Sequence, residues 1–219
     1  RGLGDVYKRQ RVSVADAGLF GGVLSALGLA VLFWASRPLS AAVAAVTLVS
    51  YLAVYTPLKR RTPFSTLVGA VPGALPPVIG WAAARGTLEG GAFVLFAILF
   101  LWQIPHFLAI AWLYRDDYAR AGFPMLPVVD REGGFTARQA VAHSLALLLV
   151  SMGAAAAGLG GPWYLGGAFV LGVALTLFAL RLVAARSLAA ARGLFLASVL
   201  YLPALCSLLL AARFQDVTR

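Results

Sequence analysis

A short basic turn preceded by tyrosines is the first group of residues that could do chemistry. Tyr51, Tyr55 and Lys59 are spaced four residues apart, which places them on one face of a helix. Pro57 is expected to bend the end of that helix. The other polar members of the turn are Thr56, Arg60 and Arg61. Cationic side chains neutralise a phosphate and tyrosine hydroxyls donate hydrogen bonds, so one interpretation is an anion-binding site. The alternative is a basic anchor with an aromatic belt at a membrane surface.

Two adjacent carboxylates, Asp116 and Asp117, form the second group. They stand at the start of the polar segment 114–139. Mg²⁺ takes oxygen ligands and is usually held by one or two carboxylates while it bridges substrate phosphates. Together with the basic turn, these aspartates supply the parts that bind a diphosphate. The alternative is a solvated helix end, in which Arg115 and Arg120 balance both charges.

The third group lies inside an apolar block, where LFLWQIPHFLAIAW contains Gln103 and His106 beside Pro105. Polar side chains at membrane depth are costly and usually face a cavity, and the proline frees a backbone carbonyl that needs a partner. If the helix continues straight to Asp117, roughly 16 Å separates it from His106, so the two would line opposite ends of a deep pocket. The alternative for His106 is a hydrogen bond between helices.

The block 64–84 is rich in residues that break helices or let them approach closely. Its glycines and prolines are Gly69, Pro72, Gly73, Pro76, Pro77 and Gly80. This pattern predicts a bent or broken membrane helix that lines a cavity. His143, Cys206 and the two methionines are expected to be structural, and Ser-His-Asp hydrolysis is poorly supported because neither histidine is beside a plausible nucleophile.

The elements that must position these side chains are membrane helices. Of the 219 residues, 61% are hydrophobic and 12% are charged, and the mean hydropathy is +0.88. A soluble domain of this length needs more polar surface. Because a span needs roughly 20 apolar residues, the sequence predicts an all-α, multi-pass transmembrane bundle. Its seven spans are expected at 17–35, 39–57, 64–84, 91–113, 140–160, 164–185 and 194–212. The single cysteine excludes disulfides, and two distant histidines exclude a zinc site.

The basic residues are distributed unevenly over the two faces that seven spans create. Only Arg37, Arg85, Arg213 and Arg219 fall on one face, so the other holds fourteen of the 18 lysines and arginines, including the basic turn. By the positive-inside rule that face is cytoplasmic. The net charge of +10 therefore reflects topology and attraction to anionic membrane lipids, and no nucleic-acid partner is expected.

The first ten residues, RGLGDVYKRQ, differ in character from the rest of the chain. They are polar, lack an initiating methionine and lead abruptly into RVSVADAG. We expect residues 1–10 to be a foreign or disordered leader and residues 11–219 to form the transmembrane domain. A short natural cytoplasmic tail is the alternative.

Three stretches of the sequence resemble a known family. YTPLKRRTPFSTLVGAVPGALPPVIGW, LWQIPHFLAIAWLYRDDYARAGFPMLPVV and, more weakly, LFLASVLYLPAL are similar to the protohaem IX farnesyltransferases, a branch of the UbiA-type intramembrane prenyltransferase superfamily. The resemblance runs from about residue 11 to residue 214. It implies nine helices around a cavity that opens near the cytoplasmic face. Since the first aspartate-rich motif of the family has no counterpart here, we expect this chain to lack two helices and to be inactive by itself.

The resemblance also implies roles for particular residues. Tyr55 and Lys59 match a Tyr-x-x-x-Lys element, and Arg60 lies beside it. Asp116 and Asp117 fall at the second aspartate-rich motif, where Asp117-Tyr118 is the characteristic pair and Tyr114 replaces an acid common in other branches. The catalytic candidates are therefore Tyr55, Lys59, Arg60 and Asp117, with Asp116 and Asp117 as metal ligands. The substrate-binding candidates are Tyr51, Thr56, Arg61, Gln103, His106, Tyr114 and Tyr118, with His106 orienting haem.

The implied reaction transfers the farnesyl group of farnesyl diphosphate to a vinyl group of protohaem IX and gives haem O. Mg²⁺ is the expected cofactor and haem is a substrate. The expected partners are farnesyl diphosphate, protohaem IX, membrane lipids and a haem A synthase, in a bacterial cytoplasmic membrane. Two alternatives are a prenyltransferase for another aromatic acceptor, which shares the same cationic turn, and a transporter built on the broken third span.

Overall fold

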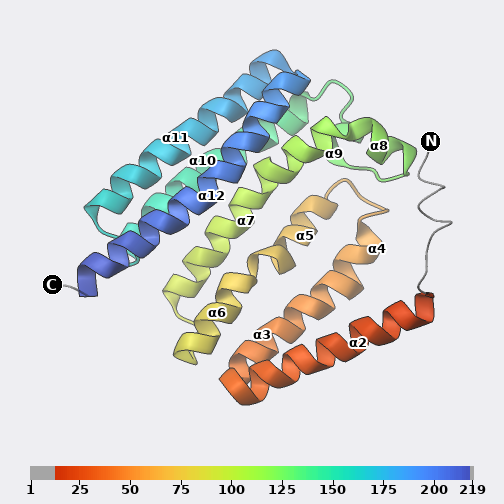
Figure 1. Ribbon diagram of the computed structural model, residues 1–219. Helices are drawn as coiled ribbons and strands as arrows, with labels where there is room; N and C mark the ends of the chain where they lie inside the picture. Colours follow the sequence, from red (N-terminus) through yellow and green to blue (C-terminus); the bar gives the residue numbers. More distant parts are fainter. Residues whose placement is uncertain (1–12, 218–219) are drawn as a thin grey trace.

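Helices joined by short connections make up the part of the chain that the computed structural model describes, residues 13–217, and no strand occurs there (Figure 1). Side chains are described up to residue 212. The elements are α2 (Val14–Val31), η1 (Leu32–Ser36), α3 (Pro38–Val49), η2 (Ser50–Tyr55), α4 (Thr56–Leu58), α5 (Ser65–Ala74), α6 (Pro76–Arg85), α7 (Gly90–Leu113), α8 (Arg115–Arg120), α9 (Leu126–Val129), α10 (Gly134–Ala156), α11 (Pro162–Ala185) and α12 (Leu188–Val217). The expected leader, residues 1–10, lies outside the described residues.

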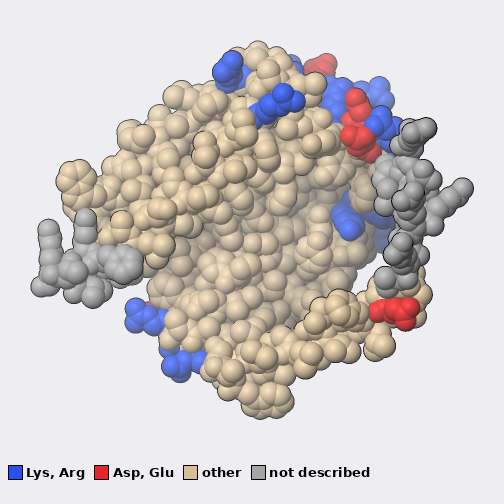
Figure 2. All heavy atoms as spheres, viewed as in Figure 1, with Lys and Arg blue, Asp and Glu red and all other residues tan. Residues whose placement is uncertain are grey.

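Seven helical segments are long and apolar enough to cross a membrane, which confirms the predicted number. They are Val14–Ser36, Pro38–Leu58, Ser65–Arg85, Gly90–Leu113, Gly134–Ala156, Pro162–Ala185 and Leu188–Ala212. Figure 2 shows charged side chains near the end of the molecule that carries α8 and again at the opposite end, with a broad uncharged band between. The chain is therefore an integral membrane protein of the all-α, multi-pass class.

Two helices begin earlier than their hydropathy predicts. α10 begins at Gly134 and α12 at Leu188, each about one and a half turns before the expected starts at residues 140 and 194. Hydrogen bonds set these starts. The Asp130 carboxylate accepts from the Thr136 backbone N–H at 2.7 Å, and the Ser187 hydroxyl oxygen accepts from the Ala190 N–H at 3.2 Å. Helices thus extend past the apolar block into the polar boundary.

The tightest packing is among α7, α10, α11 and α12, which lie together on one side of the molecule (Figure 1). Small residues let these helices approach closely: Ala109, Ala140, Ala168 and Ala179 are fully buried. Two buried tyrosines are hydrogen-bonded between these helices. The Tyr164 hydroxyl donates to the Ser151 carbonyl at 2.8 Å, and the Ser151 and Tyr201 hydroxyls share a 2.8 Å hydrogen bond. In this half of the bundle, α10 and α12 pack against α7.

The other half consists of α2, α3 and the paired helices α5 and α6. The span 65–85 is broken as predicted, since α5 ends at Ala74 and α6 begins at Pro76. Leu75 interrupts the helix because the consecutive prolines after it cannot donate backbone hydrogen bonds. α3 packs on α6, and α5 packs on α7. α2 contains no buried residue and forms the outer edge of this half (Figure 1).

The second span changes helix type before it reaches the polar boundary. η2 is a π-helix over six residues, and α4 continues from it for three. The Thr56 N–H bonds the Tyr51 carbonyl five residues back, and the Thr56 hydroxyl donates to the same oxygen at 2.9 Å. Pro57, which has no N–H, stands directly after this turn. Pro57 was predicted to bend the end of this helix. Directly before Pro57 the helix is also widened into a π-helical turn, a form that is frequent at functional sites.

Candidate functional site

A cavity of about 410 Å³ lies between η2, α5, α7 and the connection after α7. Figure 2 shows a hollow on this face with basic atoms inside its rim. The cavity is lined by Tyr51, Tyr55, Lys59, Thr66, Gly69, Gly73, Gln103, Phe107, Ile110, Tyr118, Phe123 and Met125. Five of these residues were site candidates from the sequence: Tyr51, Tyr55, Lys59, Gln103 and Tyr118. The third span also lines the cavity, as predicted.

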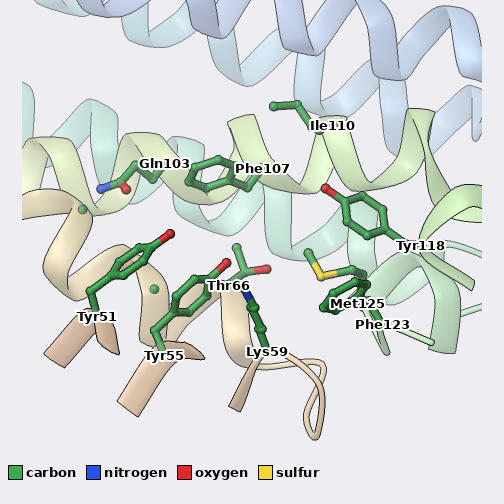
Figure 3. Close-up of a pocket in the computed structure, with 12 residues that line it drawn as sticks. Tyr51, Tyr55, Lys59, Thr66, Gln103, Phe107, Ile110, Tyr118, Phe123 and Met125 are labelled. Carbon is green, nitrogen blue, oxygen red and sulfur yellow. The ribbon is translucent and has the colours of Figure 1, made fainter. Parts of the chain in front are cut away.

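One wall carries the tyrosines and the lysine of the basic turn. The Tyr51 and Tyr55 rings contact each other with centroids 5.1 Å apart, and Lys59 Nζ lies 5.9 Å from the centroid of the Tyr55 ring. In Figure 3 both tyrosine hydroxyls and the lysine amine turn toward the same space. The wall therefore presents one cation and two hydroxyl donors, which is the combination that binds an oxyanion.

Gly69 allows the Tyr55 ring to occupy this position. A Cβ atom on Gly69 would lie 2.6 Å from Tyr55 Cε2, closer than real Cβ contacts occur. α5 therefore has no side chain where the ring packs against it. The Thr66 hydroxyl, one turn earlier on α5, is buried and has no hydrogen-bond partner among the described residues. It is a free polar group beside the tyrosines.

The wall formed by α7 combines one amide with apolar side chains. Gln103, Phe107 and Ile110 succeed one another by four and three residues, so they share a helix face. The Gln103 Nε2 atom donates to the Leu99 carbonyl at 3.0 Å and to the Ala70 carbonyl on α5 at 3.4 Å. That bridge fixes the amide between two helices.

The third wall comes from the segment after α7. The Tyr118 ring meets Phe123 edge-on with centroids 6.3 Å apart, and the Tyr118 hydroxyl points toward the cavity in Figure 3. Met125, which we expected to be structural, also lines the cavity. Sequence reasoning missed Thr66, Phe107, Ile110, Phe123 and Met125. For Phe107 and Ile110 the signal was present, because both repeat the helix face of Gln103.

Asp116 and Asp117 lie outside the cavity wall, on the exposed side of α8. Asp117 pairs with Arg120, and Asp116 lies 3.8 Å from Arg115 Nε with 84% of its side chain exposed. Among the side chains described, up to residue 212, no group of three or more acids, histidines or cysteines is arranged to hold a metal ion. One or two carboxylates suffice when Mg²⁺ is also held by substrate phosphates. The two carboxylates do not make an all-protein metal site; their oxygens suit an ion held mainly by substrate phosphates, but both lie outside the cavity wall.

His106 faces α12 and not the cavity. Its Nδ1 atom is 2.9 Å from the Ser198 hydroxyl, and its ring lies against Trp102 and Phe195 with centroid separations of 4.8 and 5.3 Å. This geometry matches the alternative of a hydrogen bond between helices. Also, α7 ends at Leu113, so the straight helix assumed between His106 and Asp117 is interrupted. The haem-orienting role of His106 stays a prediction that this geometry does not favour.

The remaining candidates lie at the edge of the site. Arg60, Arg61 and Tyr114 are exposed and do not line the cavity. Thr56 bonds to the backbone of η2 through its hydroxyl, which gives it a structural role. Of the basic turn, Lys59 is therefore the side chain that reaches the cavity.

Comparison with known proteins finds a family that matches most of the chain. The profile of the UbiA prenyltransferase family matches residues 6–212. A protoheme IX farnesyltransferase of Solibacter usitatus is 55% identical over 155 residues, which are 71% of this chain and 53% of that relative. A protoheme IX farnesyltransferase of Koribacter versatilis is 58% identical over 114 residues, or 52% of this chain and 37% of the relative. The chain spans about half the length of the curated relatives it matches, or less. No solved structure matches it.

Proposed function

This chain belongs to the UbiA prenyltransferase family, and from that premise we propose that the complete gene product transfers the farnesyl group of farnesyl diphosphate to a vinyl group of protohaem IX, giving haem O. The names of its relatives support this choice of substrate. The observation that carries the proposal is the cavity, where Lys59 and two tyrosine hydroxyls lie beside aromatic and apolar walls. A diphosphate with an isoprenoid tail needs both kinds of surface.

The polar wall would bind the leaving group. Lys59 Nζ would pair with a diphosphate oxygen, while the Tyr51 and Tyr55 hydroxyls would donate hydrogen bonds to others. As the bond between farnesyl C1 and the diphosphate oxygen breaks, negative charge grows on that oxygen. Fixed donors that face it stabilise the transition state more than the ground state. Asp116 and Asp117 would hold a substrate-bridged Mg²⁺, which supplies further charge neutralisation when bound.

The aromatic walls would protect the cationic carbon. A tyrosine or phenylalanine ring attracts a cation over its face, and Tyr55, Phe107, Tyr118 and Phe123 line the space next to Lys59. The vinyl carbon of protohaem attacks farnesyl C1, which moves the positive charge to the neighbouring carbon, and water captures it there. Apolar walls exclude other water and so limit hydrolysis of the diphosphate.

The orientation in the membrane is part of the proposal. The basic turn and α8 lie at the same end of the bundle (Figure 1), and the excess of basic residues there favours a cytoplasmic position in a bacterial cell membrane. A diphosphate made in the cytoplasm would reach Lys59 from that side. Haem O is a lipophilic product, so a haem A synthase in the same membrane is the partner we propose for its onward transfer.

Radiolabelled farnesyl diphosphate tests the substrate. Membranes containing the complete gene product are incubated with the label, Mg²⁺ and either protohaem IX or 4-hydroxybenzoate, and the products are separated and weighed by mass spectrometry. Label in haem O with protohaem alone is the expected result. Label in prenylated hydroxybenzoate would assign the cavity to another aromatic acceptor, and no transfer to either would contradict the proposal.

A further inference from the structure

Gln103 carries an oxygen atom whose orientation is fixed and whose partner is missing. Only 5% of the residue is exposed. Its Nε2 atom donates to the Leu99 and Ala70 carbonyls, and a carbonyl oxygen can accept only from the NH₂ end of an amide. The amide therefore presents Oε1 away from those carbonyls. No described residue donates a hydrogen bond to it.

Gly73 leaves the space that this oxygen occupies. A Cβ atom on Gly73 would overlap Oε1 and lie 3.1 Å from Gln103 Cδ. Both residues line the cavity, and Figure 3 shows the Gln103 amide at the opposite end from Tyr118. The oxygen lines the cavity without a donor among the described residues, and an acceptor left unpaired there costs free energy. Because the cavity is roomy and also presents the Tyr51 and Tyr55 hydroxyls, a water molecule is the smallest donor that could satisfy it.

Along α5, the Gln103 oxygen lies about one helical turn beyond the Tyr55 ring. Gly69 adjoins the Tyr55 ring and Gly73 adjoins Gln103, and four residues of helix separate them by roughly 6 Å. Figure 3 shows Lys59 on the side of Tyr55 away from Gln103, and its Nζ atom lies 5.9 Å from the centroid of the Tyr55 ring. A line through the cavity therefore meets the cation, then the aromatic ring, then the amide oxygen.

We propose that Gln103 Oε1 holds the water molecule that captures the cation formed on protohaem. This proposal rests on the proposed function. The terminal vinyl carbon bonds to farnesyl C1 as diphosphate leaves with the electron pair, and the adjacent carbon becomes positive. The water oxygen bonds to that carbon and gives its proton to the released diphosphate. Without a positioned water, the same cation loses a proton from carbon, and the product is an alkene lighter than haem O by one water.

Product partitioning tests this role. Gln103→Leu keeps the volume and removes the acceptor, so we expect the ratio of alkene to haem O to rise on the order of tenfold, the effect of losing one hydrogen bond. Gly73→Ala keeps the glutamine but displaces its oxygen, and it should shift the ratio in the same direction. Gly80→Ala is the matched control, because a Cβ there meets nothing within 4 Å. Reactions in H₂¹⁸O with mass spectrometry measure both products.

The outcomes separate the two proposals. If the unmodified enzyme forms neither haem O nor the alkene, the proposed function fails. If it forms haem O with ¹⁸O in the hydroxyl group but Gln103→Leu and Gly73→Ala leave the product ratio unchanged, the role of Gln103 is wrong while the function stands. If Gln103→Leu does not accumulate in the membrane, the ratio measured for Gly73→Ala against Gly80→Ala decides.

Discussion

Lys59 differs from the two arginines after it in what its side chain contacts. Its amine lies over the Tyr55 ring inside the cavity, whereas Arg60 and Arg61 are exposed. An exposed cation in water interacts weakly with a phosphate, while one beside a half-buried ring in a cavity acts at lower effective dielectric constant. The chemistry of the basic turn is therefore concentrated in one residue.

Replacing this lysine should separate activity from stability. We expect Lys59→Ala to lower farnesyl transfer by about a hundredfold, because a charge-assisted contact to the leaving group is lost, while the amount of enzyme in the membrane stays the same. Arg192→Ala, which removes an exposed cation elsewhere, is the control and should keep full activity. Transfer assays and immunoblots measure both. A parallel fall of activity and abundance would mean that Lys59 is structural.

Sequence spacing predicted part of this site. Tyr51, Tyr55 and Lys59 were expected on one face because they are four apart, and all three line the cavity. Spacing could not reveal Thr66 or Met125, since these reach the cavity only when α5 and the segment after α8 pack against α7. Spacing also could not show that Asp117 pairs with Arg120 whereas its neighbour Tyr118 lines the cavity.

At the scale of elements, apolar blocks predicted the spans better than they predicted helix ends or helix type. The start of α10 depends on the Asp130 carboxylate bonding the Thr136 N–H, a contact between residues six apart that hydropathy does not register. The π-helical turn at Ser50–Tyr55 was likewise not predicted, because its hydrophobic residues also fit an α-helix. A bent or broken helix was predicted for the third span from its glycines and prolines, and the structure places the break at Leu75.

The close contact between α5 and η2 can be tested at Gly69. We expect Gly69→Ala to lower farnesyl transfer at least tenfold, because a Cβ atom there would lie 2.6 Å from the Tyr55 ring and push it out of place. Gly153→Ala is the control, since its Cβ meets nothing within 4 Å. Initial rates at several farnesyl diphosphate concentrations give the comparison. Equal rates for both variants would show that the Tyr55 position is unimportant.

The contact between α7 and α12 assigns a different role to His106. Removing its hydrogen bond to Ser198 and its packing on Trp102 should lower stability by about 1–3 kcal/mol, so His106→Ala should melt earlier in detergent. Ser198→Ala should have a smaller effect, and the double variant should show coupling of about 0.6–1.7 kcal/mol. Haem titration of His106→Ala tests the alternative, in which His106 contacts haem. Weakened haem affinity with unchanged melting would restore the haem-contact prediction.

At the scale of the whole molecule, the distribution of charge could be predicted because it depends on the solvent. Ionised groups avoid the hydrocarbon layer, so the linear order of apolar blocks and charged loops already separates the two ends. The grouping of α7, α10, α11 and α12 could not be predicted in the same way. Lipid is as apolar as leucine, and which helices meet depends on small-residue fit.

Cysteine labelling tests the orientation of the molecule. In a Cys206→Ser background, Glu132→Cys places a thiol in the connection before α10, and Glu89→Cys places one before α7 at the opposite end. Both native residues are exposed. We expect a membrane-impermeant maleimide added to intact spheroplasts to label position 89 and not position 132, because the more basic end should be cytoplasmic. The reverse pattern would invert the proposed topology.

The widened turn at Ser50–Tyr55 has a consequence for sequence length. A π-helix accommodates one residue more than an α-helix in the same rise, and here that extra residue lies between the outer edge of the bundle and the basic turn. Deleting a single residue from the turn would restore ordinary winding and leave α2 and α3 close to their present orientation relative to Lys59, whereas a deletion in α3 would rotate α2 by about 100°. Within the second span, a single-residue deletion should therefore be tolerated better at this turn than in the α-helical stretch before it.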